Sequence, residues 1–272
     1  MFFFCILTGF FMSFFSLDAI CQSISSNSDP CLKENVFMKI VYDNYLVDHA
    51  LIPSWGFACV VEISTQTILF DTGGNSDILL SNMEKMNIDP EDIDAIFISH
   101  IHSDHLGGLA GFLDKNHDVT VYIPPSFPIK IRNEIVRRGA RYQDIGEFAR
   151  LFENVYSTGP MGLRIREQSL IIDTIDGLVV ITGCAHPGIV KIVKSVKRRF
   201  PEKKIVLVMG GFHLSGASEA ELLKIVLALR NTGVQRVAPS HCSGDRCRDI
   251  FHENFTENYI DGGLGKVIQF IK

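Results

Sequence analysis

The sequence lacks the repeats and linkers that would divide it into several domains. It also lacks the excess of positive charge that a protein with a polyanionic partner usually carries. No internal repeat, low-complexity tract or Pro/Gly/Ser-rich linker interrupts the chain from Val36 onward, so we expect one globular domain over residues 36–272. The 272 residues carry 26 Lys and Arg against 31 Asp and Glu, a formal net charge of −5. This balance gives no electrostatic reason to expect nucleic acid as a partner.

The seven cysteines lack the spacing of a structural zinc site, because no two of them form a CxxC pair. Without the first 21 residues an odd number remains, so at least one thiol is unpaired or has an intermolecular partner. Cys242 and Cys247 are close enough in sequence to pair across a short loop in an oxidising compartment. The five remaining cysteines are Cys31, Cys59, Cys184, Cys242 and Cys247.

The first 35 residues differ in composition from the rest. The segment "MFFFCILTGFFMSFFSLDAIC" is apolar up to Leu17 and has no Lys or Arg, and a polar stretch follows it. This pattern favours a signal peptide over residues 1–21, a polar linker over 22–35, and export to the periplasm or the exterior. An uncleaved membrane anchor is an alternative, since about 17 apolar residues is the lower limit for a spanning helix. Another alternative is that translation starts at a codon upstream of the folded domain, which itself begins near Val36.

The apolar pattern from Val36 onward predicts strands first and then alternating strands and helices. The runs "FMKIVYD", "GFACVVEIS" and "TQTILFDTGG" are separated by polar turns, which is typical of an antiparallel meander. The second half alternates apolar strands such as "KKIVLVMGGFH" with helical patterns such as "SEAELLKIVLALRNTG". We therefore expect an α/β fold, a four-layer αββα sandwich of two mixed β-sheets flanked by helices.

Residues 97–109, "FISHIHSDHLGGL", place three histidines and an aspartate within six residues, directly after an apolar run. In an extended segment, residues two apart face the same side, so His100 and His102 can bind one ion. Asp104 and His105 follow in the turn that opens the next helix, where they can face a second ion. Neutral imidazoles and a carboxylate suit zinc, iron or manganese. The spacing favours metal ligation over a solvated, merely histidine-rich loop.

The segment "HIHSDH" fits the H-x-H-x-D-H signature, and "LFDTGG" precedes it, so the chain resembles the metallo-β-lactamase fold superfamily. The series "WGFACVVE", "DTGG", "SHIHSDHLGGL", "TGCAHPGI", "GGFHL" and "PSHCSGD" is similar to one subgroup of that superfamily. The subgroup takes its name from a 7,8-dihydropterin-linked ribofuranosylaminobenzene phosphate synthase. The resemblance extends from Met38 to Ile271 and implies the αββα fold.

The resemblance also implies two divalent metal ions, expected to be zinc, with manganese or iron as alternatives. By this resemblance, His186 of "TGCAHPG" completes the first site with His100 and His102. His241 of "PSHCSGD" joins Asp104 and His105 at the second site.

One departure from the superfamily pattern concerns the residue between the two metals. Many superfamily hydrolases end a strand in Gly-Asp and bridge the metals with that aspartate, whereas this chain has Gly183 and Cys184. Either Cys184 ligates, or His213 of "GGFHL" substitutes, or the second site is weak and partly water-filled. We favour Cys184 as a small residue that packs beneath the loop. His213 is expected either as a second-site ligand or as a substrate-binding group.

Other polar residues have weaker signals. Asp71 ends a strand expected near the first ligands, where it would orient the ligating histidines, and a turn-capping aspartate is the alternative. Glu167 matches a recurrent subgroup position, but an exposed glutamate in a turn fits as well. His49, His117 and His252 are expected at the surface or in structural roles, and the basic run at residues 194–204 is expected to be a solvated helix face.

These observations predict a metal-dependent hydrolase that uses a hydroxide activated by two metals on a small ester, phosphoester or amide-like substrate. Asp104 would position the water or accept its proton, and His213 would donate a proton to the leaving group. A dihydropterin-type transferase that forms a C–N bond is one alternative, and a non-catalytic metal-binding or sensing protein is another. Membrane contact is expected only through an uncleaved N-terminal segment, and the pattern does not indicate an oligomeric state.

Overall fold

The computed structural model describes residues 1–2, 35–63 and 66–271. The fold described below is that of the unit Lys33–Lys272. The signal peptide and linker predicted for residues 1–35 lie almost wholly outside the described residues. Within the described ranges, no helix combines the length and the apolar character needed to cross a membrane.

The first sheet has seven strands in the order β13-β1-β2-β3-β4-β5-β6. Strands β1, β2 and β3 pair antiparallel, as the predicted meander requires, and β3 to β6 continue the sheet in parallel. The strands are β1 (Val36–Tyr42), β2 (Ala58–Ile63), β3 (Gln66–Phe70), β4 (Ala95–Phe97), β5 (Thr120–Ile123), β6 (Arg141–Asp144) and β13 (Val267–Phe270).

The second sheet has six strands in the order β12-β11-β10-β9-β8-β7. Strands β10, β11 and β12 are parallel, so their carboxyl ends meet at one edge, while β7 to β10 pair antiparallel. The strands are β7 (Ala149–Phe152), β8 (Val155–Ser157), β9 (Leu170–Asp173), β10 (Leu178–Thr182), β11 (Ile205–Gly211) and β12 (Val234–Ser240).

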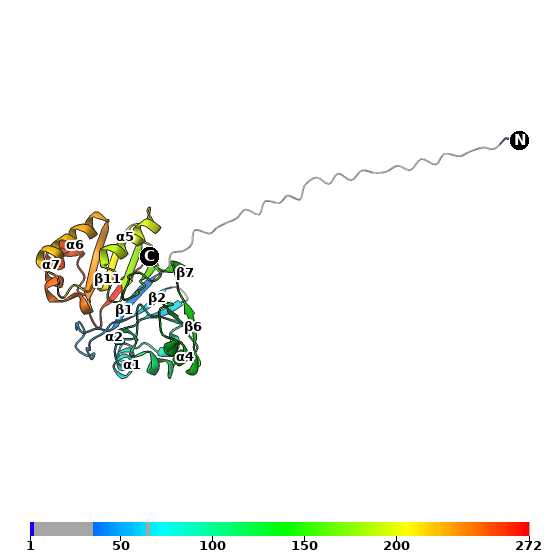
Figure 1. Cartoon of the computed structure of the whole chain (residues 1–272), viewed down its shortest axis with the longest axis horizontal. Coiled ribbons are helices and arrows are strands. Elements are labelled where there is room, and N and C mark those ends of the chain that lie inside the picture. Colours follow the sequence, from blue (N-terminus) through cyan, green and yellow to red (C-terminus); the bar gives the residue numbers. More distant parts are fainter. Residues whose placement is uncertain (3–34, 64–65, 272) are drawn as a thin grey trace. The chain divides into compact units, whose positions relative to one another are not determined.

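Three apolar clusters hold four layers together. One cluster lies between the sheets and contains Phe70 and Phe97 of the first sheet and Ile181 and Met209 of the second. A second cluster joins α1 (Ser76–Lys85), α3 (Leu109–Leu113) and α4 (Ile129–Arg137) to the outer face of the first sheet. A third joins α5 (Ile189–Arg199), α6 (Glu219–Asn231) and α7 (Asp245–Phe255) to the second sheet. Figure 1 shows these helix groups on opposite sides, and the predicted αββα sandwich is confirmed.

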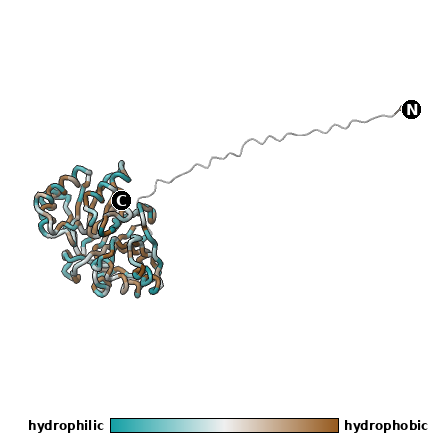
Figure 2. Tube along the Cα trace, in the orientation of Figure 1, coloured by the Kyte–Doolittle hydropathy of each residue, from teal (hydrophilic) through white to brown (hydrophobic). Residues whose placement is uncertain are grey.

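Helix α5 illustrates how the sequence pattern produces this layering. Its buried residues Ile189, Ile192, Val193 and Val196 recur at helical spacing, so one apolar stripe faces the sheet. The basic residues of the 194–204 run that lie in its last turn, Lys197 to Arg199, are partly or fully exposed, as predicted for a solvated face. Figure 2 shows the resulting mixture of hydrophobic and hydrophilic stretches along the chain.

The structure corrects two local predictions. The turn predicted to hold Asp104 and His105 is a short helix of its own, α2 (Ser103–Leu106), which precedes the predicted next helix, α3. Cys242 and Cys247 are both free thiols, so the disulfide considered between them is wrong. Three short helices of 3-10 type complete the described elements: η1 (Pro90–Asp92), η2 (His241–Ser243) and η3 (Thr256–Asn258).

Candidate metal centre

The predicted ligands come from loops that follow the carboxyl ends of strands in both sheets. His100 and His102 follow β4, and Asp104 and His105 lie on α2 immediately afterward. His186 follows β10, and His241 directly follows β12. Segments more than 130 residues apart in sequence therefore meet where the edges of the two sheets come together.

The first predicted ligand set is brought together. The ring centroids of His100, His102 and His186 lie 4.6 to 4.9 Å apart. His100 Nε2 lies 3.2 Å from His102 Nδ1, so both nitrogens face the space between the rings. His100 is buried, while His102 and His186 are partly exposed.

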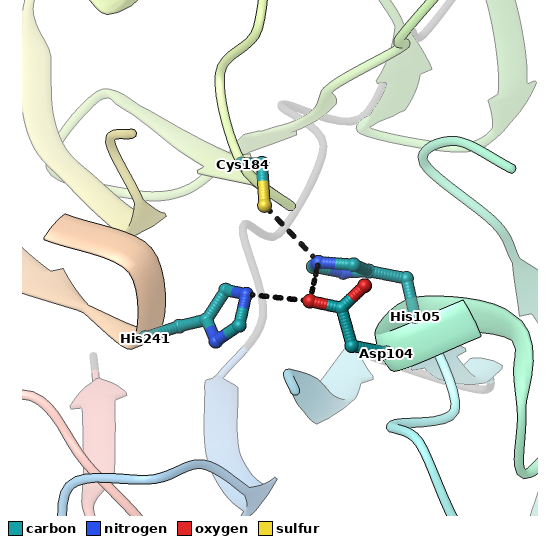
Figure 3. Close-up of side chains that lie close together, drawn as sticks. All are labelled: Asp104, His105, Cys184 and His241. Atoms are coloured by element: carbon teal, nitrogen blue, oxygen red, sulfur yellow. Dashed lines mark hydrogen bonds and ion pairs between the residues drawn. The ribbon is translucent and has the colours of Figure 1, made fainter. Parts of the chain in front are cut away.

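The second predicted set is brought together beside the first. Asp104 Oδ2 lies 3.2 Å from His241 Nε2 and 3.6 Å from His105 Nε2 (Figure 3). The rings of His105 and His100 have centroids 4.2 Å apart, so the two sets are adjacent. All six predicted ligands thus converge on one small region.

An unsatisfied nitrogen indicates what the second set is arranged to hold. His241 Nε2 is buried and makes no hydrogen bond, although Asp104 Oδ2 lies only 3.2 Å away. A buried polar atom without a partner is costly, so such atoms call for an explanation. Two ligand atoms that converge on one ion approach each other closely without hydrogen-bond alignment. The donor set of imidazoles and one carboxylate therefore fits a divalent metal ion.

Asp71 and Ser99 orient histidines of both sets. The buried Asp71 carboxylate accepts hydrogen bonds from His105 Nδ1 (2.8 Å) and from the Ser99 hydroxyl (2.7 Å). Ser99 Oγ in turn lies 2.9 Å from His100 Nδ1. Each histidine is thereby held with Nε2 toward the centre, as in metal sites whose ligands are fixed by a carboxylate. Asp71 has the orienting role predicted from the sequence.

Glu167 organises the loop that carries His186. Its buried carboxylate accepts hydrogen bonds from the backbone N–H groups of Cys184 (2.9 Å), Ala185 (2.8 Å) and His186 (2.8 Å). It also accepts a bond from His186 Nδ1 at 2.8 Å, which leaves Nε2 free. Glu167 is 1% exposed, so the alternative of an exposed glutamate is wrong.

Asn44 and Asp43 hold His241, and the sequence alone did not indicate them. Asn44 Oδ1 lies 2.9 Å from His241 Nδ1, and Asp43 Oδ1 accepts a hydrogen bond from the His241 N–H. Both residues directly follow β1, where polar side chains after a buried strand were the available signal. Trp55 was also missed, and its ring centroid lies 4.8 Å from that of His241.

Burial keeps several of the imidazoles neutral. It lowers the pKa of His100 and His102, and it lowers the pKa of His105 to about 3. Burial alone would raise the pKa of Asp104, but the adjacent His241 and His105 hold it below its usual range. Neutral imidazole lone pairs and an ionised carboxylate are the forms that bind metal.

The backbone is unusual at the same positions. Asp71, Ala185, His213 and His241 have φ between 49° and 59°, a region that side chains with a Cβ rarely adopt. Strained backbone persists where surrounding structure enforces it, and it concentrates at functional sites. Here it occurs in the loops that aim the predicted ligands.

Cys184 and His213 lie beside the centre. Cys184 is buried, as expected, but it belongs to none of the three apolar clusters, and its Sγ lies 3.2 Å from His105 Nε2 (Figure 3). His213 is exposed, and its ring centroid lies 4.6 Å from that of His186. The Cys184 thiol, hydrogen-bonded to Cys242, lowers the pKa of Cys242 to about 5, and the same contact raises the pKa of Cys184. His49, His117 and His252 are exposed, as predicted.

Comparison with known proteins agrees with this geometry. A sequence profile of the Metallo-beta-lactamase superfamily matches residues 56–200. The chain belongs to this superfamily. It is 28% identical over 269 residues to the 7,8-dihydropterin-6-methyl-4-(beta-D-ribofuranosyl)-aminobenzene-5'-phosphate synthase of Methanocaldococcus jannaschii, covering 80% of this chain and 92% of the synthase.

Two further superfamily members show similarity of different extent. The crystal structure of a metal-dependent hydrolase of the beta-lactamase superfamily, Tm1679, superposes with a TM-score of 0.74 at 29% identity, covering 87% of this chain and 100% of the hydrolase. Ribonuclease Z of Pediococcus pentosaceus is 26% identical over 151 residues, which cover 46% of this chain and 48% of the ribonuclease. The superfamily therefore includes relatives named as hydrolases and as a synthase.

Proposed function

We propose that the chain is a metal-dependent hydrolase that acts on a small ester, phosphoester or amide-like substrate. The convergence of six metal-binding side chains carries the proposal, because four of the histidines have one ring nitrogen engaged by another residue and the other directed at the centre. The similarity to the solved metal-dependent hydrolase supports it. Two divalent ions, zinc in our proposal, would supply Lewis acidity and lower the pKa of a water molecule.

The residues of the chain divide the remaining work. Asp104 is one-fifth exposed at its side chain, so it can meet solvent at the centre and accept a proton from water there. His213 is exposed beside His186, where it can donate a proton to a leaving group. Interaction with Cys242 raises the pKa of His213, which favours the protonated form that a donor needs.

A transferase that forms a C–N bond is the second candidate. The relative named as a dihydropterin-linked phosphate synthase supports it, since 92% of that protein aligns with this chain. A transferase would use the same side chains to hold a phosphorylated substrate and move a proton. Small-molecule chemistry is common to both candidates, and neither involves nucleic acid.

Metal stoichiometry and a substrate panel test the proposal. The purified full chain should bind two ions per protein and hydrolyse at least one phosphodiester, lactone or β-lactam with zinc, manganese or iron. C–N bond formation from a pterin precursor and an aminobenzene ribofuranosyl phosphate would support the transferase instead. Two bound ions with no activity on either panel would support a non-catalytic metal-binding role.

Two substitutions test the ligands directly. His102→Ala should reduce the bound metal at the first set, and Asp104→Ala at the second. His117→Ala and Asp118→Ala make the same chemical changes at exposed positions and should leave the metal content unchanged. Unchanged metal in both His102→Ala and Asp104→Ala would refute the ligand assignment.

We also propose export of the protein by the N-terminal segment, with membrane anchoring as the alternative. The apolar composition of residues 1–21 supports it. N-terminal sequencing of the protein recovered from cells should show a chain that begins at Gln22. An intact Met1 on soluble exported protein would contradict cleavage.

A further inference from the structure

Cys184 is common to both candidate metal sets. Its Sγ and the ligand atoms of Asp104, His105 and His241 all lie within 4.8 Å of one another. The same Sγ lies within the same distance of ligand atoms of His100 and His186, which also approach each other. Among the described residues that these two groupings contain, Cys184 alone belongs to both.

The backbone fixes the sulfur in this place. Glu167 accepts hydrogen bonds from the N–H groups of Cys184 and Ala185, so the loop cannot turn without losing both bonds. A Cβ at Gly183 would lie 2.2 Å from Ser99 Oγ, and one at Gly211 would lie 2.2 Å from the Gly183 carbonyl oxygen. Glycine at both positions therefore lets the Cys184 loop approach the histidine cluster closely.

Cys184 belongs to none of the three apolar clusters of the described residues. A cysteine that behaves as a small hydrophobe contacts apolar atoms. This sulfur instead lies 3.2 Å from His105 Nε2, and Figure 3 shows it directed at the space beside Asp104. Burial at 3% exposure shields it from solvent but leaves it facing ligand atoms.

We propose that Cys184 Sγ is a bridging thiolate, a ligand shared by the two metal ions. The inference rests on the proposed two-metal centre and identifies the residue that takes the place of a bridging carboxylate. On metal binding the thiol would release its proton to solvent, so the bridge carries the same single negative charge as an aspartate. A thiolate also favours zinc over manganese, which prefers oxygen ligands.

Cobalt substitution distinguishes a sulfur ligand from the other donors. The full chain loaded with two Co²⁺ ions should show an intense near-ultraviolet band from thiolate-to-cobalt charge transfer. Cys184→Asp should keep both ions, since a carboxylate can bridge them, and should lose the band. Cys184→Ser should lose the band and bind metal more weakly. X-ray absorption of the zinc form should show a sulfur scatterer at about 2.3 Å in the wild-type chain and in neither Cys184 variant.

Two other cysteines provide matched controls. Cys242 lies in a third grouping with Cys184 and His213, and Cys59 is buried on β2 and belongs to none of these groupings. Cys242→Ser and Cys59→Ser should both retain the band. Loss of the band in Cys242→Ser but not in Cys184→Asp would overturn the proposal and make Cys242 the sulfur ligand.

Counting metal separates this inference from the function on which it rests. Two bound ions without a thiolate band in the wild-type chain would overturn the Cys184 bridge and leave the two-metal hydrolase intact. A wild-type chain that binds fewer than two ions at saturation would overturn the two-metal centre itself. The band and two ions in the wild-type chain, with the band lost and both ions kept in Cys184→Asp, would support the bridge.

Discussion

Replacement of Glu167 by Gln should weaken both the fold and the metal centre. The carboxylate accepts four hydrogen bonds, two at each oxygen, from three backbone N–H groups and from His186 Nδ1. The amide of glutamine has one oxygen, so its NH₂ group must face two donors. An unsatisfied buried donor costs about 1 to 3 kcal/mol, so Glu167→Gln should lose about 2 to 6 kcal/mol of stability. Domains of this kind have about 5 to 15 kcal/mol in total.

Urea unfolding of the metal-free chain measures this loss as a lower midpoint. Zinc titration should show in addition a 10- to 100-fold weaker affinity, the size of effect expected when the group that orients a ligating histidine is lost. Glu134→Gln makes the same change on α4, where the glutamate pairs with Arg137 and Arg138 at the surface, and it should lower the urea midpoint far less than Glu167→Gln does. Unchanged midpoint and zinc affinity in Glu167→Gln would refute the reasoning.

Three further predictions follow from the structure. Asn44→Ala removes the partner of His241 Nδ1 and should weaken zinc affinity at one site by about 10-fold or more. The control Asn258→Ala removes an amide that donates a hydrogen bond to Glu257 and should leave zinc affinity unchanged. Equal zinc affinities in the two variants would contradict this prediction. Trp55 is the sole tryptophan of the sequence, is 57% exposed and lies next to His241. Bound Co²⁺ should therefore quench its fluorescence emission saturably, and excess zinc should restore the emission. Absence of saturable quenching would place Trp55 away from the metal. Removal of metal by a chelator should lower the thermal unfolding midpoint, because a metal at 100 times its Kd adds about 2.7 kcal/mol per site to the free energy of unfolding. An unchanged midpoint would argue against metal binding to the folded state.

The histidine cluster was predictable because its spacing is local. Four side chains within six residues reveal their common site without knowledge of the fold. His186 and His241 were predictable only through resemblance, since no spacing links them to the cluster. Asn44 carried only the weak signal of a polar residue after a buried strand, because its partner His241 lies 197 residues away.

The sequence predicted no strand where the strand has no buried residue. All four residues of β6 are exposed, and β7 has no fully buried residue, so neither strand carries an apolar pattern. These strands lie at the ends of their sheets, where pairing on one side suffices. The central strands, which are buried throughout, produced the apolar runs on which the fold prediction relied.

The position of the ligands makes metal binding depend on the packing of the two sheets. Asp104 belongs to the side of the first sheet, and His241, 3.2 Å away, belongs to the last parallel strand of the second. Asn44, which follows β1 of the first sheet, holds His241 from the other direction. A shift of one sheet against the other would therefore separate Asp104 from His241, the residues proposed to bind one ion. The apolar cluster between the sheets is thus part of what fixes the metal geometry, because its packing sets the distance between the two sheets that carry these residues.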